Sequence, residues 1–151
     1  MGTYLVVMDR AIPPQSLRFG LLNLASRHKP ARFVLLQTPQ LWPGDSLESG
    51  HRAAAAYIAS ARSLLTAMGL SVVATVVGDP LPRKAIAAEM AGERTYEGIV
   101  LTSKPPSVLL LLQIDVAHQL ERKYRVPVIC IDPDTSVASD RAVMARSGSR
   151  V

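Results

Sequence analysis

The stretch "VLTSKPPSVLLLLQIDVAHQL", residues 100–120, holds the pattern that decides the fold. Its first residues end the apolar run "YEGIVLTS" (96–103), which is typical of a buried β-strand. After two prolines, apolar residues recur over 107–124, a segment long enough for a helix. A strand that passes directly into a helix is typical of a β-α-β unit, so this stretch predicts an α/β domain with a parallel sheet.

The same alternation of strand and helix patterns runs through the rest of the chain. We expect strands at 3–9, 31–38, 70–77, 96–103 and 126–132. Helices are expected between Pro13 and Pro30, over a stripe from Ala54 to Met68, at 81–91 and at 107–124. Strands that alternate with helices imply right-handed crossovers, so we predict one open five-stranded parallel sheet with helices on both faces.

The composition bounds the domain organisation. With 151 residues, of which 48% are hydrophobic and 19% are charged, the chain suits one globular domain. We expect this domain to cover residues 1–132. The segment 133–151 is small and polar with scattered arginines, so we expect it to be a poorly ordered tail.

Two observations indicate the cellular compartment. The longest apolar run, 108–112, is far below the ~20 residues that a membrane span needs, so no membrane association is expected. The single cysteine, Cys130, excludes an intrachain disulfide and fits a reducing compartment. We therefore expect a cytoplasmic protein, and we expect Cys130 to be a small buried hydrophobe in its apolar strand.

The positive charge of the chain is unevenly distributed. The net charge is +5, and residues 10–44 contain five basic residues and no acid. No nucleic-acid-binding motif or interleaved aromatic pattern accompanies these cations. We therefore expect a solvated helix face here and no nucleic-acid partner.

The sequence also favours a binding protein over an enzyme. His28, His51 and His118 are not spaced with a carboxylate or a cysteine as a metal site or a catalytic triad requires. No nucleophile elbow, P-loop or dinucleotide fingerprint occurs. We expect no catalytic residues and no metal site.

A phosphate-accepting receiver domain is a further alternative, because it has a similar alternation of strands and helices. Asp9, Asp79 and Thr102 could serve as three parts of its site. However, only one acid follows the first strand, and Asp132 stands where the lysine of such a site belongs. The magnesium cage and the neutralising cation would both be incomplete.

In an open α/β sheet, ligands bind beyond the carboxyl ends of the strands, where neighbouring strands wind in opposite directions. The polar and small residues that follow the predicted strands are therefore the candidate ligand site. They are Asp9, Arg10, Gln37, Thr38, Gly78, Thr102, Ser103, Lys104 and Ser107. A carboxylate after the first strand could accept hydrogen bonds from ribose hydroxyls or hold a cation, or it could cap a turn.

Several of these segments together resemble the universal stress protein family. The resemblance rests on Asp9, "VVGDP" (76–80), "EGIVLTS" (97–103) and "VPVICID" (126–132), and it spans nearly all of 3–132. It implies the strand order 3-2-1-4-5, commonly a homodimer, and in one branch of the family the binding of ATP. It also implies that Asp9, Gln37 and Thr38 lie where the family contacts ribose and adenine.

The segment after the fourth strand departs from the ATP-binding branch. That branch carries G-x2-G-x9-G-[S/T], whose backbone amides hold the triphosphate. Here Thr102 and Pro105 stand at the first two glycines, and Ile114 or Asp115 stands at the third. Proline offers no N–H to a phosphate and cannot adopt the left-handed turn of a glycine, so the usual phosphate loop is missing.

These observations leave two functions open. We expect a universal-stress-type protein in stress response or regulation that binds a partner or a small ligand, without the usual ATP motif and without a cofactor. The alternative is a protein that binds ATP or another adenine nucleotide through Asp9, Thr38, Ser103 and Lys104, in a reshaped, glycine-free phosphate loop.

The last strand is the expected dimer contact. An edge strand exposes unpaired backbone groups, and many members of the family dimerise by pairing such strands. The residues concerned are Val128, Ile129, Cys130 and Ile131. The apolar run 108–112 points all the way round its helix, so a partner, the loop around Trp42 or the core of the domain is expected to cover it.

Overall fold

The computed structural model describes residues 2–8, 14–27, 30–39, 43–102 and 107–131. Side chains within 107–115 are not part of this description. Four candidate site residues, Asp9, Arg10, Ser103 and Lys104, lie outside the described residues, and so does the segment 133–151 that we expect to be a tail.

Every strand and helix that the sequence predicts is present, with bounds that shift by one or a few residues. The strands are β1 (Gly2–Met8), β2 (Ala31–Gln37), β3 (Val72–Val77), β4 (Gly98–Thr102) and β5 (Val128–Ile131). The helices are α1 (Arg18–Arg27), α2 (Leu47–Ala67), α3 (Pro82–Met90) and α4 (Ser107–Tyr124), and a 3-10 turn (Pro14–Leu17) precedes α1.

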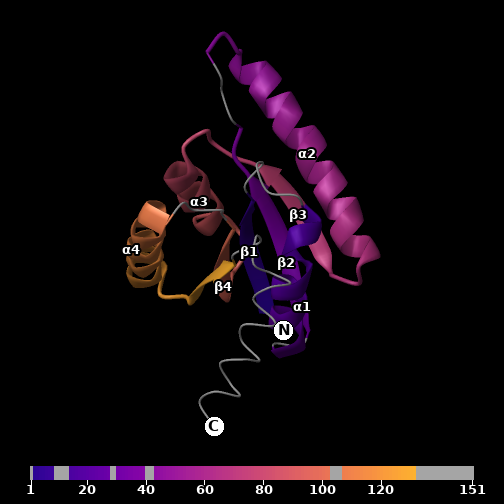
Figure 1. Cartoon of the computed structure of the whole chain (residues 1–151), viewed down its shortest axis with the longest axis vertical. Coiled ribbons are helices and arrows are strands. Elements are labelled where there is room, and N and C mark those ends of the chain that lie inside the picture. The colour runs from indigo at the N-terminus through magenta and orange to yellow at the C-terminus, as the bar shows by residue number, and fades with distance from the viewer. Residues whose placement is uncertain (1, 9–13, 28–29, 40–42, 103–106, 132–151) are drawn as a thin grey trace.

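The five strands form one parallel sheet in the order β3-β2-β1-β4-β5 (Figure 1). Tyr4 of β1 is opposite Phe33 of β2 on one side and opposite Gly98 of β4 on the other. The predicted fold class and strand order are therefore confirmed.

Helices cover both faces of the sheet, and each face has its own core. On one face, Val6 and Leu35 of the sheet pack with Leu21 of α1 and Ile58 of α2. On the other face, Leu5 and Leu36 pack with residues of α3 and α4, including Ile86 and Leu120. Alternate residues of β1 and β2 thus serve opposite cores, which explains why these strands are apolar almost without interruption.

The long helix α2 begins and ends with recognisable signals. Ser46 caps its start, since its hydroxyl oxygen accepts a hydrogen bond from the backbone N–H of Ser49 at 3.0 Å. Its buried stripe includes Ala54, Ile58 and Leu65, as the sequence spacing predicts. Gly69 follows with φ of +94°, a conformation that favours glycine at a helix end. Among the described residues, no helix has the length and apolar character needed to cross a membrane.

Cys130 lies in the predicted strand, but the expectation that it is buried is wrong. Its side chain is exposed, whereas Ile131 next to it is buried. The reason is tertiary: β5 is the edge of the sheet, and it pairs only with β4. Successive side chains of a strand point to opposite faces, so Ile131 packs into the core next to Gly20 of α1, whereas Cys130 points to the other face at this edge and keeps contact with solvent.

Candidate functional site

The candidate ligand site is the carboxyl edge of the sheet on both sides of β1. β2 lies on one side of β1 and β4 on the other. The helix that follows β2, α2, covers one face of the sheet, and the helix that follows β4, α4, covers the opposite face. This is the switch point at which open α/β sheets bind ligands. Of the predicted site residues, the structure describes the side chains of Gln37, Thr38 and Thr102, and it describes Gly78.

Gln37, the last residue of β2, is the most unusual polar group at this edge. It lies opposite Met8 of β1 and Val77 of β3, and only 1% of its surface is exposed. Its amide nitrogen, Nε2, donates a hydrogen bond to the carbonyl oxygen of Thr38 at 3.0 Å. Its amide oxygen, Oε1, is buried and has no hydrogen-bond partner among the described residues. An unpaired buried acceptor of this kind costs about 1–3 kcal/mol in the free energy of folding.

The backbone around Gln37 is already engaged. Its carbonyl oxygen accepts a hydrogen bond from the N–H of Gly78 at 2.9 Å, which ties the ends of β2 and β3 together. Thr38, which follows, is half-buried and offers its carbonyl to the Gln37 side chain. At the end of β2, the buried side-chain atom that lacks a hydrogen-bond partner among the described residues is therefore Oε1 of Gln37.

Gly78 has a structural reason to be glycine. A Cβ at this position would lie 2.7 Å from the Cβ of Ala85 in α3 and 3.1 Å from Cδ1 of Leu36. The close approach of α3 to the end of β3 excludes any larger residue. The next residue, Asp79, accepts a hydrogen bond from the N–H of Leu81 at 2.9 Å and so forms the turn into α3. These contacts assign the "GDP" segment a role in packing and turn formation.

Thr102, the last residue of β4, is also buried, with 5% exposure. Its hydroxyl donates a hydrogen bond to the carbonyl oxygen of Val7 in β1 at 2.6 Å. This bond joins the two strands of the switch point. Ser107 is the first residue of α4, and its side chain is outside the described set, so its role as a ligand or a cap stays a prediction.

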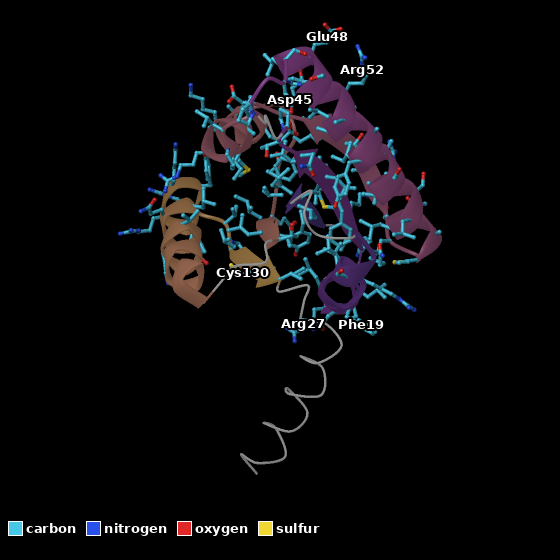
Figure 2. The ribbon with its side chains drawn as sticks, turned by 45° about the horizontal axis from the view of Figure 1, so that its top comes forward. Phe19, Arg27, Asp45, Glu48, Arg52 and Cys130 are labelled. Atoms are coloured by element: carbon cyan, nitrogen blue, oxygen red, sulfur yellow. The ribbon has the colours of Figure 1, made fainter. Side chains whose placement is uncertain are left out.

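The predicted dimer residues lie at the opposite edge of the sheet from β3. Val128 and Ile129 are half-buried, Cys130 is exposed and Ile131 is buried against α1, next to Gly20. Figure 2 shows Cys130 on this outer strand, far from Glu48 and Arg52 at the outer end of α2. Partial burial, and then the charge of Glu121, raises the pKa of the Cys130 thiol, so the thiol stays protonated near neutral pH.

Other chemistry at the described residues is limited. No group of three or more histidine, cysteine, aspartate or glutamate side chains in the described part of the chain could hold a metal ion. His51 is half-buried in α2, His118 is exposed on α4, and His28 lies outside the described residues. The histidines that the structure describes thus sit on helices and not at the carboxyl edge.

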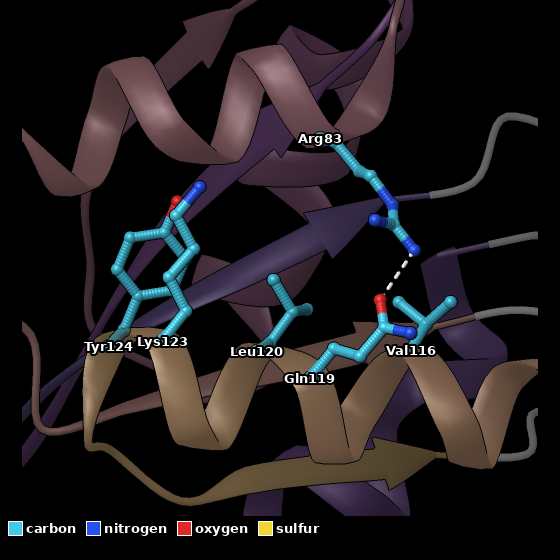
Figure 3. A pocket seen from close by; sticks show the side chains of 6 residues that line it. All are labelled: Arg83, Val116, Gln119, Leu120, Lys123 and Tyr124. Carbon is cyan, nitrogen blue, oxygen red and sulfur yellow. Dashed lines mark hydrogen bonds between the residues drawn. The ribbon is translucent and has the colours of Figure 1, made fainter.

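The sequence did not predict a groove that lies between α3 and α4. This groove has a volume of about 110 Å³ and is lined by six side chains (Figure 3). They are Arg83, Val116, Gln119, Leu120, Lys123 and Tyr124. Arg83 and Gln119 are 36 positions apart and follow no motif, so only the packing of the two helices brings them together.

Solved structures resemble this one along nearly the whole chain. The universal stress protein from Archaeoglobus fulgidus matches with a TM-score of 0.52 and 20% identity, over 87% of this chain and 94% of that chain. A protein of the universal stress protein family from Burkholderia pseudomallei matches with a TM-score of 0.51 and 19% identity, over 86% and 95%. No protein-family model and no curated protein matches the sequence.

The chain has the universal stress protein fold. At about one residue in five identical, this likeness establishes the architecture, and ligand and partner must be argued from the residues of this chain.

Proposed function

We propose that this chain is a universal-stress-type regulatory protein that acts by binding a small ligand or a partner at the carboxyl edge of its sheet. The observation that carries the proposal is the buried Oε1 of Gln37, which has no hydrogen-bond partner within the described part of the chain. A ligand that donates an N–H or O–H to this oxygen would remove the cost of leaving it unpaired. Such a site would also be specific for ligands that carry the donor. An analogue without the donor would leave Oε1 unpaired and restore that cost.

The proposal does not include the family's glycine-rich ATP loop. Thr102 stands at the first glycine of that loop, and its hydroxyl is already bonded to Val7. Gly78 at the neighbouring strand end is needed for packing against Ala85. Neither residue needs a phosphate to explain it. We favour a protein of this kind that is cytoplasmic and has no enzymatic activity.

A second candidate function is the binding of an adenine nucleotide through a reshaped loop. The observation in its favour is the chemistry of Gln37: the exocyclic amino group of adenine is a donor, and Oε1 is an acceptor that no described residue pairs with. The resemblance of the sequence to universal stress proteins would also imply adenine near the ends of the first two strands, which favours this candidate. In this case Asp9, Thr38, Ser103 and Lys104 would complete the site.

Thermal unfolding separates these two functions. The purified chain would be melted with and without ATP, ADP, AMP and cyclic AMP, each at millimolar concentration with magnesium. A ligand at a hundred times its Kd adds ~2.7 kcal/mol, and each kcal/mol moves the midpoint of a domain of this size by roughly 2–4 °C. We expect no nucleotide to move the midpoint by more than a degree or two. A rise of several degrees with one nucleotide would replace the first candidate with the second.

The first candidate also needs a positive test. Native mass spectrometry of the chain as purified from cells would be compared with that of the Gln37→Met variant. We expect the wild type to retain a small molecule or a partner that the variant lacks, because the variant has a similar shape without the acceptor. Identical spectra that show the bare chain in both samples, in several expression hosts, would count against a ligand at Gln37.

We further propose that the protein forms a homodimer through β5. Supporting observations are that β5 pairs with one strand only and that its Cys130 side chain is exposed. The variant Cys130→Lys places a charge on this edge with little cost to the monomer, and it should shift the chain from dimer to monomer in sedimentation. The matched control is Val73→Lys on β3, the other edge strand, where the side chain is 43% exposed. If the two variants behave alike, β5 is not the contact.

A further inference from the structure

The groove between α3 and α4 has a chemical pattern that the proposed function does not use. Its floor is apolar, since Leu120 is 7% exposed and Val116 is half-buried. Figure 3 shows Leu120 in the middle, Arg83 with Gln119 and Val116 towards one end, and Lys123 with Tyr124 at the other. The groove therefore offers one cation at each end of an apolar centre.

The guanidinium of Arg83 is held in place across the groove. Its Nη2 donates a hydrogen bond to Oε1 of Gln119 at 2.8 Å, and this bond links α3 to α4. A guanidinium has five N–H donors, and the bond to this neutral amide occupies one of them. Arg83 is thus oriented by a partner that does not neutralise it.

The second cation is also positioned. The Nζ of Lys123 lies over the ring of Tyr124 at 5.4 Å from its centroid, a cation–π contact that leaves the ammonium charge in place. Gln119 and Lys123 are four positions apart on α4, so their backbone anchors are separated by about 6 Å along the helix axis. The two cations are therefore held at points about one helical turn apart along α4: Arg83 through its hydrogen bond to Gln119, and Lys123 through its own backbone.

Two described acids on the helices that form the groove have other partners. Oε1 of Glu89, on α3, accepts hydrogen bonds from the Tyr96 hydroxyl at 2.5 Å and from Arg94 at 2.9 Å. Oε1 of Glu121, on α4, accepts a hydrogen bond from the backbone N–H of Val128 at 3.4 Å. Within the described part of the chain, neither Arg83 nor Lys123 forms a salt bridge.

We propose that this groove binds a short dianion, with two carboxylates about one helical turn apart on an apolar spacer. One carboxylate would pair with Arg83 and the other with Lys123, while the spacer lies on Leu120 and Val116. The volume of about 110 Å³ supports a ligand of this size, because pockets for whole cofactors and drug-sized molecules measure roughly 300–1,000 Å³. The two carboxylates come either from a free dicarboxylate or from two acidic side chains of a protein.

The test is a titration of the full chain with glutarate. Binding is monitored through the chemical shifts of the backbone amide NMR signals of Gln119, Leu120 and Lys123. Butyrate, with a similar spacer and one carboxylate, is the matched ligand control. We expect glutarate to bind roughly threefold to tenfold more tightly than butyrate, which is what one exposed or partly buried ion pair supplies. Equal affinity for the two ligands, or no shift with either, would overturn the proposal.

Variants then assign the two charges. Arg83→Gln and Lys123→Gln should each reduce the affinity for glutarate to about that for butyrate. Arg52→Gln is the matched control, since it removes the same charge from α2 on the opposite face of the sheet, where Arg52 pairs with Glu48 at 3.3 Å. An equal loss in Arg52→Gln would show a general effect of net charge and would count against the groove. Because Arg83, Lys123 and Arg52 are all exposed, the three variants should melt within a few degrees of the wild type.

A peptide arm identifies the source of the carboxylates. A short blocked peptide with two glutamates two positions apart presents its carboxylates at a similar separation. Tighter binding of this peptide than of glutarate supports a protein partner, and the reverse order supports a free dicarboxylate. The readout is independent of Gln37, so a failure here and a failure of the carboxyl-edge proposal can be told apart.

Discussion

The ends of β2 and β4 make an instructive pair, because each places a buried polar side chain beside the central strand β1. Gln37 ends β2 with 1% exposure, and Thr102 ends β4 with 5% exposure. The Thr102 hydroxyl donates to the carbonyl of Val7 at 2.6 Å, whereas Oε1 of Gln37 has no partner among the described residues. Burial of a polar residue at the carboxyl edge is therefore not enough to mark a ligand site, and pairing decides which residue is available.

The difference follows from the reach and chemistry of the two side chains. A hydroxyl on a short stem can satisfy itself with one bond to the neighbouring strand. A glutamine amide carries donors and an acceptor at opposite corners, and here its donor side turns to the carbonyl of Thr38. The acceptor then points where no described donor lies. We call the end of β4 closed, because its buried hydroxyl is hydrogen-bonded, and the end of β2 open, because its buried acceptor has no partner among the described residues.

Gly78 lies at the same edge, and its substitution tests whether a residue there serves packing and not ligand binding. Of the changes considered, it has the largest expected effect on the free energy of unfolding. In Gly78→Ala the new Cβ would lie 2.7 Å from the Cβ of Ala85, so helix α3 must shift. Overpacking of this kind costs about 2–3 kcal/mol, which denaturant unfolding would measure as a lower midpoint at an unchanged slope.

A double-mutant cycle is the control for this prediction. Adding Ala85→Gly to Gly78→Ala removes the atom that the new methyl group meets. The double variant should therefore be less destabilised than the sum of the two single variants. Additive effects would show that the clash with Ala85 is not the reason for glycine at this position.

These residues also show how far the sequence predicts the molecule. The runs in β1, β2 and β4 and the stripe of α2 determine the elements and the sheet type, because burial imposes a period that is visible in the residues. The positions of Gln37, Gly78 and Thr102 at the carboxyl edge follow from that. Their roles do not follow, because polarity at a position does not say which partner the side chain meets.

Two further features depend on tertiary contacts that leave no local pattern. Cys130 lies in an apolar strand, yet it is exposed because its strand is the edge of the sheet. The groove at Arg83 and Gln119 exists because α3 and α4 lie side by side on one face. No spacing rule connects two helices that are separated by a strand, so neither their contact nor the groove could be predicted.

Thr102 gives the second prediction, with an intermediate effect. Thr102→Val keeps the shape of the side chain and removes the hydrogen bond to Val7, so we expect a loss of about 1–2 kcal/mol in the free energy of unfolding. Thr102→Ser is the control, since it keeps the hydroxyl and should lose less. The change concerns the closed end of the edge, so ligand or partner binding at Gln37 should persist in Thr102→Val. Loss of binding together with unchanged stability would reverse the roles assigned to the two strand ends.

Substitution of Gln37 has the smallest expected effect on the free energy of unfolding, but the sign of that effect is the most informative. In Gln37→Met, a side chain of similar length replaces the amide. The variant loses the bond from Nε2 to the Thr38 carbonyl, worth about 0.5–1.5 kcal/mol, and it also loses the unpaired acceptor, which costs about 1–3 kcal/mol. The second effect is larger, so the purified variant should be more stable than the ligand-free wild type by about 1 kcal/mol, even though it no longer binds the ligand. Gain of stability with loss of binding is the behaviour of a residue retained for function. A variant that is less stable than the ligand-free wild type would show that Oε1 is already satisfied in the folded chain, and the end of β2 would then be as closed as the end of β4.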